Sequence, residues 1–441
     1  MTLLIISPDY ASHLLPLATL GTAWQRAGQS VVVATGTATA PIVESFGFER
    51  AHLQLGKGSN PGVIRAEQQP VGEDDALRGF FDATRRGMVE TLAFQAEARL
   101  SDLMWEPVRV AREVQAVVAA VAPDAIIVDH LAFSARLALV AAGIPHADVV
   151  VGHPSALPLG DEVYGYPPVW PRAFSPDPDA LAALRELCDR VSASFTAEWN
   201  TALAELNPAA RPSEAAFSEH GEPLLLNYPA QLADPGRALP AHVFLGSAVR
   251  QEPADADVAA WLAAGEGPFV YVSFGSFLSV RSDVLARVTR AIADLGLRAA
   301  VALGSADRAD LGELPRDWLV REFLPQVTLL GSAAAAVTHG GNNSVTEAMT
   351  FGVPLLVLPF STDQFAGAAA IDAAGFGVAL APNEASVAQL RDALAEVIAL
   401  PREPLDAVSA DLRQAPGSSR AFAALSETSA RIPSGSAATD R

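Results

Sequence analysis

The stretch VTHGGNNSVTEAM, residues 337–349, changes from an apolar pattern to a polar one within a few residues. An alanine-rich apolar run ends in His339, two glycines, two asparagines and Ser344, after which the pattern becomes helical. Glycines allow the backbone to approach a ligand closely, and the N–H groups at a helix N-terminus attract anions. The stretch therefore predicts a strand, a tight turn and a helix that form a site for a phosphate-bearing ligand.

A purely structural interpretation of the same residues is also open. Ser344 and Glu347 have the spacing of a capping box, in which each side chain bonds the backbone N–H of the other residue. Gly352 and Pro354 are typical of the end of the helix. A capping box explains two of the polar residues and leaves His339, the glycines and the asparagines without a role.

Apolar runs alternate with helical patterns along the whole chain. Examples are LLIIS at residues 3–7, AIIVD at residues 125–129 and FVYVSFGS at residues 269–276. Continuous apolar strands between helices are typical of parallel sheets that are buried on both faces. Because 441 residues exceed what one core usually serves, the sequence predicts two α/β domains.

The expected boundaries follow from composition. Proline and glycine concentrate after Asn227, which is typical of a connecting segment. The predicted division is residues 1–226 for the first domain, 227–250 for a linker, 251–432 for the second domain and 433–441 for a disordered tail.

Charge and composition argue against several classes of protein. The net charge of −20 argues against nucleic acid or an anionic membrane as a partner. Cys188 is the single cysteine, so no internal disulfide can form, as is typical of a reducing cytosol. Residues 1–10 lack the basic region of a signal peptide, and no apolar run has the length of a membrane span. We therefore expect a cytoplasmic protein that holds any anionic ligand with local groups.

Two flanking segments extend the opening stretch. FLPQVTLL precedes it at residues 323–330, and LPFSTDQ follows it at residues 358–364. Together, residues 323–364 resemble the donor-binding signature of the UDP-glycosyltransferase superfamily, nucleotide-sugar enzymes that modify natural products in plants and actinobacteria. The resemblance implies the GT-B fold, in which two Rossmann-like, doubly wound parallel-sheet domains face each other across a cleft. The first domain would bind the acceptor and the second the nucleotide-sugar donor.

The resemblance also assigns donor contacts. They are Gly275 and Ser276 near the diphosphate, Phe323 and Gln326 at the nucleobase, His339, Gly341, Asn343 and Ser344 at the diphosphate, Glu347 at the ribose, and Asp363 and Gln364 at the transferred sugar. Phe323 and Asn342 stand where plant members have tryptophan, so the resemblance leaves open whether the donor is a UDP- or a dTDP-sugar. The Asp363–Gln364 pair is suited to vicinal hydroxyls and favours glucose over a deoxysugar.

His13 follows the first predicted strand in SPDYASHLLP, and this turn lacks the glycine pattern of dinucleotide-binding dehydrogenases. A neutral imidazole can accept the proton of an attacking hydroxyl near pH 7. A lone histidine at a helix start is more often structural, but the resemblance matches His13 and Pro16 to the family's catalytic base motif. Asp129, at the end of AIIVD, matches the carboxylate that orients this base; capping the following helix is its alternative role.

The sequence gives less specific predictions for the residues that bind the acceptor. Irregular stretches at residues 56–75 and 153–179 are long enough to line a binding site. They supply the candidate acceptor contacts Tyr164, Tyr166, Trp170 and His153. The aromatic side chains favour a flat or aromatic acceptor such as a polyphenol, a macrolide or a sterol-like compound.

The implied reaction is a single displacement with inversion, with no cofactor and no metal, in which the nucleotide sugar is a co-substrate. The sequence DAD at residues 255–257 is expected to be a solvated helix start and not a metal motif. The alternatives that remain open are a non-catalytic nucleotide-sugar-binding protein, a nucleotide-sugar epimerase or polysaccharide-type transferase, and a dTDP-deoxysugar transferase. We expect a monomer or weak dimer.

Overall fold

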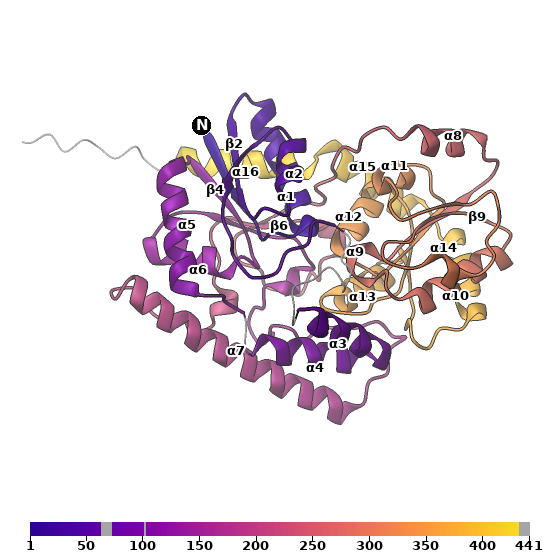
Figure 1. The fold of residues 1–441 in the computed structure, drawn as a ribbon, viewed down its shortest axis with the longest axis horizontal. Coiled ribbons are helices and arrows are strands. Elements are labelled where there is room, and N and C mark those ends of the chain that lie inside the picture. The colour runs from indigo at the N-terminus through magenta and orange to yellow at the C-terminus, as the bar shows by residue number, and fades with distance from the viewer. Residues whose placement is uncertain (63–72, 101–102, 432–441) are drawn as a thin grey trace, which may run out of the picture.

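A computed structural model of the protein describes residues 1–62, 73–100 and 103–431 and contains two parallel β-sheets. In Figure 1 the domains that contain them lie side by side, the first in indigo to magenta and the second in orange to yellow. The first sheet consists of β1 (Thr2–Ile6), β2 (Ser30–Thr35), β3 (Glu49–His52), β4 (Ala125–Asp129), β5 (Ala147–Val150), β6 (Leu224–Leu226) and β7 (His242–Phe244). The second consists of β8 (Phe269–Ser273), β9 (Arg298–Ala302), β10 (Leu319–Arg321), β11 (Ala335–Thr338), β12 (Leu355–Val357) and β13 (Gly377–Ala379).

Both sheets are doubly wound. The strand order is β3-β2-β1-β4-β5-β6-β7 in the first sheet and β10-β9-β8-β11-β12-β13 in the second. β1 pairs in parallel with β2 and β4, and β8 pairs in parallel with β9 and β11. Each domain therefore has the Rossmann-like topology that the apolar runs and the resemblance predicted.

Helices connect the strands and cover the sheet faces. In the first domain they are α1 (Ala11–Arg26), α2 (Ala40–Ser45), α3 (Glu73–Arg86), α4 (Met88–Arg99), α5 (Pro107–Val121), α6 (Phe133–Ala142) and α7 (Pro178–Leu206). Further along the chain they are α8 (Ala256–Ala264), α9 (Gly275–Leu278), α10 (Ser282–Asp294), α11 (Gln326–Leu330), α12 (Asn342–Phe351), α13 (Gln364–Ala374), α14 (Val387–Ala399), α15 (Glu403–Gln414) and α16 (Gly417–Arg431).

The continuous apolar strands are explained by two cores per sheet. Along β1, Leu3 and Ile5 belong to one buried cluster, whereas Leu4 and Ile6 belong to the cluster on the opposite face. Successive strand residues point to opposite faces, so a strand that is covered on both sides is apolar along most of its length. The same alternation occurs in β8.

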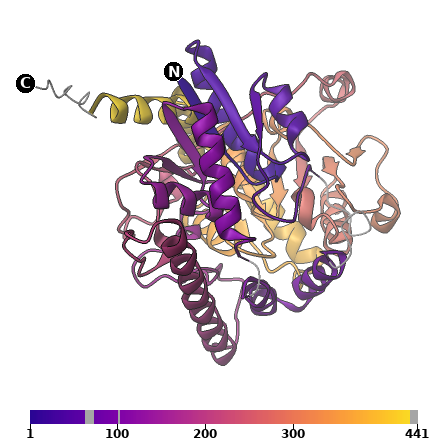
Figure 2. The same cartoon turned by 60° about the vertical axis from the view of Figure 1, so that its left-hand side comes forward.

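The chain crosses between the domains twice. β7 pairs with β6 in the first sheet, so the segment 227–250 that was expected to be a linker contains a strand. At the other end, α16 packs on α1, where Trp24 and Phe422 meet edge to face with ring centroids 5.0 Å apart. Figure 2 shows the yellow α16 beside the indigo N-terminal elements. Residues 417–431, which were expected in the second domain, therefore cover the first.

α3 makes a further contact between the domains. Phe80 packs against a core cluster of the second domain, and the Arg281 guanidinium donates to the carbonyl of Thr84 at 2.9 Å. The predicted tail at residues 433–441 and half of the irregular stretch 56–75, residues 63–72, lie outside the described residues. Among the residues that are described, no helix combines the length and apolar character needed to cross a bilayer.

Candidate active site

Both sheets change direction at one place. β1 lies between β2 and the much later β4, and β8 lies between β9 and β11. In open α/β sheets, ligands bind outside the carboxyl ends of the strands at such a switch point. The segments that follow β1, β4, β8 and β11 face one another across the domain boundary and line a cavity of about 490 Å³.

The first switch point joins His13 and Asp129. α1 begins directly after β1 and carries His13 in its first turn, while Asp129 is the last residue of β4. Because Ile6 of β1 is in register with Val128 of β4, the two side chains meet although they are far apart in sequence. Nδ1 of His13 lies 2.8 Å from Oδ2 of Asp129. The other carboxylate oxygen, Oδ1, accepts from the backbone N–H of Leu131 at 2.8 Å. This is not the capping contact expected as an alternative, because α6 begins at Phe133 after the N-cap Ala132 and has no side-chain cap.

The protonation of this pair follows from its burial and mutual charge. Burial alone lowers the pKa of an imidazole, but the charge and hydrogen bond of Asp129, with a contribution from Asp363, outweigh it and raise the pKa of His13 above its ordinary value. Burial alone would raise the pKa of Asp129, but the charge and hydrogen bond of His13 hold that pKa below its ordinary value. With Nδ1 facing the carboxylate, Nε2 of His13 is the nitrogen left to accept a proton.

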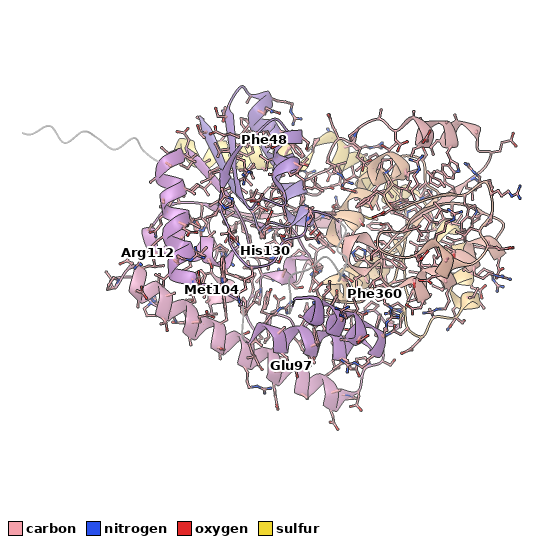
Figure 3. All side chains as sticks on the ribbon, in the orientation of Figure 1. Phe48, Glu97, Met104, Arg112, His130 and Phe360 are labelled. Atoms are coloured by element: carbon pink, nitrogen blue, oxygen red, sulfur yellow. The ribbon has the colours of Figure 1, made fainter. Side chains whose placement is uncertain are left out.

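His130 is adjacent to this pair. Its Nδ1 lies 3.2 Å from the carbonyl oxygen of Val149. Burial lowers its pKa, against the charge of Asp129. Figure 3 labels His130 in the middle of the first domain, and the residue also forms part of the cavity lining.

The second switch point places His339 against two glycines. A Cβ atom at Gly275 would lie 2.8 Å from Cε1 of His339, and one at Gly341 would lie 2.5 Å from Nε2. Gly275 also has φ +69°, a conformation that favours glycine. Burial lowers the pKa of His339 to about 4, more than the charge of Asp363 raises it, so the ring is neutral near pH 7. Its Nδ1 has no hydrogen-bond partner among the described residues.

The helix that follows His339 begins without a side-chain cap. α12 starts at Asn342 after the N-cap Gly341 and ends at Gly352 in the left-handed conformation, as predicted. The capping box between Ser344 and Glu347 is wrong, because the helix begins three residues earlier than that motif requires. The backbone N–H groups of the first turn are therefore available to an anion in the cavity.

Glu347 is a buried member of a polar network. Its Oε1 accepts from Arg250 and its Oε2 accepts from Nε2 of Gln326, each at 2.5 Å. Burial raises the pKa of Glu347, against the charge of Arg250. The network continues through Oε1 of Gln326, which is 3.3 Å from the hydroxyl of Tyr271 and 3.4 Å from Oγ of Ser344.

Glu347 lies outside the cavity lining, and both its oxygens accept hydrogen bonds from residues that line it. Arg250 and Gln326 stand between Glu347 and the cavity. Arg250 also binds Oε1 of Glu252 at 2.8 Å. The sequence carried no signal for Arg250, since it falls in the segment expected to be a linker.

Phe323 and Asn343 both line the cavity. Phe323 is 61% exposed and free to stack on a planar ligand. Asn343 lines the cavity, but its Nδ2 donates to the carbonyl of Ser12 across the domain boundary at 2.9 Å. The side chain of Ser276 lies outside what the structure describes.

Asp363 and Gln364 line the cavity with their polar atoms already engaged. Oδ2 of Asp363 accepts from the backbone N–H of His153 in the first domain at 2.6 Å. Oε1 of Gln364 accepts from the backbone N–H groups of Phe360 and Ser361. The preceding residue, Thr362, has φ +52°, which is unusual for a β-branched side chain and was not predicted.

The acceptor side contains only some of the predicted residues. Tyr164 and Tyr166 line the cavity. Trp170 does not, because its ring packs against the apolar cluster around α7. The ring of His153 also points elsewhere: it bonds Oγ of Ser155 at 2.8 Å and stacks edge to face on Tyr228.

The sequence DAD at residues 255–257 starts α8. The side chain of Asp255 accepts from the backbone N–H groups of Asp257 and Val258, as in an N-cap. Both carboxylates also pair with Arg321, at 2.9 and 2.8 Å. In the described part of the chain, no group of three or more His, Cys, Asp or Glu side chains is arranged to hold a metal ion.

Comparison with known proteins places these features in context. The family model described as UDP-glucoronosyl and UDP-glucosyl transferase matches residues 182–405, just over half of the chain. A relative from Bacillus subtilis (strain 168), the NDP-glycosyltransferase YjiC, is 30% identical over 162 residues, which are 36% of this chain and 41% of that protein. The L-demethylnoviosyl transferase of Streptomyces niveus is 27% identical over 402 residues, or 88% of both chains. In several matches, YjiC among them, the alignment spans about a third to two fifths of the relative's own length.

Solved structures extend the likeness to the whole chain. The spinosyn forosaminyltransferase SpnP aligns with a TM-score of 0.70 at 19% identity, covering 98% of this chain and 100% of that one. The glycosyltransferase VinC in complex with DTDP aligns with a TM-score of 0.65 at 20% identity, also covering 98% and 100%. At these identities the likeness shows a shared architecture, and the GT-B fold is confirmed.

Proposed function

We propose that this chain, which belongs to the UDP-glucoronosyl and UDP-glucosyl transferase family, transfers a sugar from a nucleoside diphosphate to a hydroxyl group of a small natural product. The observation that carries the proposal is the 2.8 Å contact between His13 and Asp129 on one side of a cavity whose other side holds His339 and the N-terminus of α12. A base and an anion site then face each other across the domain boundary.

His13 acts as the general base. The acceptor hydroxyl gives its proton to Nε2 of His13 while its oxygen attacks the anomeric carbon of the donor. The bond between that carbon and the phosphate oxygen breaks, and the nucleoside diphosphate leaves with the electron pair. Asp129 keeps the imidazole in the required tautomer and stabilises the imidazolium that forms. A single displacement of this kind inverts the anomeric configuration.

The second domain stabilises the leaving group. The first-turn N–H groups of α12 and the neutral ring of His339 donate hydrogen bonds to the departing diphosphate. Phe323 stacks on the nucleobase, and Gln326 bonds its edge. In this proposal Glu347, which is paired with Arg250, accepts a hydrogen bond from Gln326 and fixes the orientation of that side chain. The proposed reaction uses no metal ion.

We propose glucose as the transferred sugar, because Asp363 and Gln364 have the residue types that bind vicinal hydroxyls. A second candidate, a deoxysugar carried by thymidine diphosphate, is favoured by one observation. The oxygens of these side chains already accept from backbone N–H groups, which leaves fewer partners for hydroxyls. VinC, whose structure contains DTDP, supports the same candidate.

The test is a panel of UDP- and dTDP-sugars, with glucose and deoxysugar members, combined with phenolic and macrolide acceptors. We expect a product whose mass exceeds that of the acceptor by one sugar residue, with equimolar release of nucleoside diphosphate and an inverted anomeric centre by NMR. Nucleotide binding without product across the panel would favour the non-catalytic alternative and contradict the proposal.

A further inference from the structure

The first-domain side of the cavity contains an arginine that the proposed reaction does not use. Arg99 ends α4 and lines the cavity together with Tyr164, Gly165 and Tyr166. Its guanidinium carbon lies 4.9 Å from the ring centroid of Tyr164, in a cation–π arrangement. The backbone at Gly165 also packs closely against this guanidinium, because a Cβ atom at Gly165 would lie 2.8 Å from Nη1 of Arg99.

No described residue pairs with the charge of Arg99. Within residues 1–62, 73–100 and 103–431, its guanidinium has no carboxylate within ion-pair distance and no hydrogen-bond acceptor. Arg250, the other arginine in the cavity lining, binds both Glu347 and Glu252. The nearby thiol of Cys188 supplies no counter-charge, because burial raises its pKa to about 11.

A structural role accounts for only part of this arrangement. Arg99 stands in the last turn of its helix, where a cation is favoured by the helix dipole. That preference explains a basic residue at the position. It does not require the guanidinium to line a cavity, to stack on an aromatic ring or to remain without a carboxylate in a protein of net charge −20.

We propose that Arg99 forms a subsite for a carboxylate on the acceptor, so that the preferred acceptors are aromatic hydroxy acids. This inference rests on the proposed transfer function and deepens it. Tyr164 and Tyr166 contact the aromatic part, the hydroxyl faces His13, and the carboxylate meets the planar fork of Arg99, whose donors match its two oxygens. A local cation is needed because the overall charge repels anionic ligands.

The inference predicts discrimination between an acid and its ester. For hydroxyaryl carboxylic acids and their methyl esters, we expect the kcat/KM of the acid to exceed that of the ester by about 10- to 100-fold, the range of a charge-assisted hydrogen bond. Arg99→Met keeps an apolar stem and should bring the ratio close to one. Arg99→Lys keeps the charge without the fork and should give an intermediate ratio.

A matched control is available on the neighbouring ring. Arg185 stacks on Tyr166 at 5.4 Å but pairs with Asp189 and lies outside the cavity lining. Arg185→Met should therefore keep the wild-type ratio. A wild-type ratio of one or less, or a preference for the acid that survives in Arg99→Met, would overturn the inference.

A binding measurement separates this inference from the proposed function. The acids and esters are titrated calorimetrically into the wild type and Arg99→Met, each saturated with a nucleoside diphosphate. Acid binding that weakens at least tenfold in Arg99→Met supports the subsite even if no sugar is transferred to any acceptor. Acid binding that is undetectable, or equal in the two proteins, contradicts the subsite whether or not neutral acceptors are glycosylated.

Discussion

Each domain brings two residues together at the switch point of its sheet, and the two pairs differ in chemistry. In the first domain, His13 follows β1 and meets the Asp129 carboxylate at the end of β4. In the second, Gly275 follows β8 and leaves room for His339 after β11. The charged partner raises the pKa of His13, whereas burial lowers the pKa of His339 to about 4.

The comparison shows that one topology can supply either a proton acceptor or a hydrogen-bond donor. A carboxylate neighbour stabilises the protonated imidazole and makes the ring a base. A glycine neighbour and a buried position keep the ring neutral over the physiological pH range, so it can donate a proton into a hydrogen bond without changing charge. The following predictions test this difference.

The largest effect is expected from removing the base. His13→Ala should lower kcat/KM about 10³- to 10⁴-fold, because no other described histidine in the cavity lining forms a hydrogen bond to a carboxylate. Calorimetric titration with the nucleoside diphosphate should give an unchanged Kd. His52→Ala is the control, since His52 is exposed on β3 and outside the cavity lining. Unimpaired transfer by His13→Ala would contradict the assignment of His13 as the general base.

Neutralising the partner should have the next largest effect. Asp129→Asn removes the charge that raises the pKa of His13, and we expect the plateau rate to fall about 10²- to 10³-fold. Only the neutral ring accepts a proton, so the rate falls as the pH drops through this pKa. The substitution lowers the pKa, and the acidic limb of the pH–kcat/KM profile should move to lower pH. An acidic limb that does not move would contradict the pairing.

The third prediction concerns His339. His339→Ala should weaken binding of the nucleoside diphosphate about 10- to 100-fold, the value of a hydrogen bond to a charged group. His339→Gln keeps an N–H donor and should recover part of the loss. The acidic limb of the rate profile should stay where it is in both variants, because this ring does not titrate with activity. A shift of the limb would mean that the two histidines do not have separate roles.

The smallest expected effect is at Arg250, which acts through Gln326 and Glu347. Arg250→Met should raise the KM for the donor about fivefold, corresponding to about 1 kcal/mol, with little change in kcat. Arg250→Lys should restore part of the affinity. A large fall in kcat with unchanged donor KM would indicate that Arg250 has a direct part in the chemistry.

Much of the fold could be predicted from sequence for a physical reason. A strand buried on both faces is apolar along most of its length, so runs such as AIIVD and LLIIS indicate strands. The meeting of His13 and Asp129 could also be predicted, because carboxyl ends of parallel strands lie at one edge of a sheet. β7 could not, since three residues within a proline-rich segment give no periodic signal.

The missed site residues depend on how segments pack in three dimensions. Trp170 was expected to face the acceptor, but an aromatic side chain in a loop can as well fill a core, and its sequence neighbourhood does not distinguish the two. Arg250 reaches the cavity because the connection between the domains passes beside it. Arg99 is held at the cavity by its contact with the ring of Tyr164. Neither relation is encoded in local pattern.

The double crossing described for the fold has a mechanical consequence. The outgoing connection after β7 and the returning one before α16 touch each other, with the N–H of Gly417 donating to the carbonyl of Ser247 at 3.1 Å. Two connections joined side by side restrict the relative orientation of the domains more than a single connection would. We therefore expect any relative rotation of the two domains to hinge at this point, with α16 moving together with the domain that carries His13.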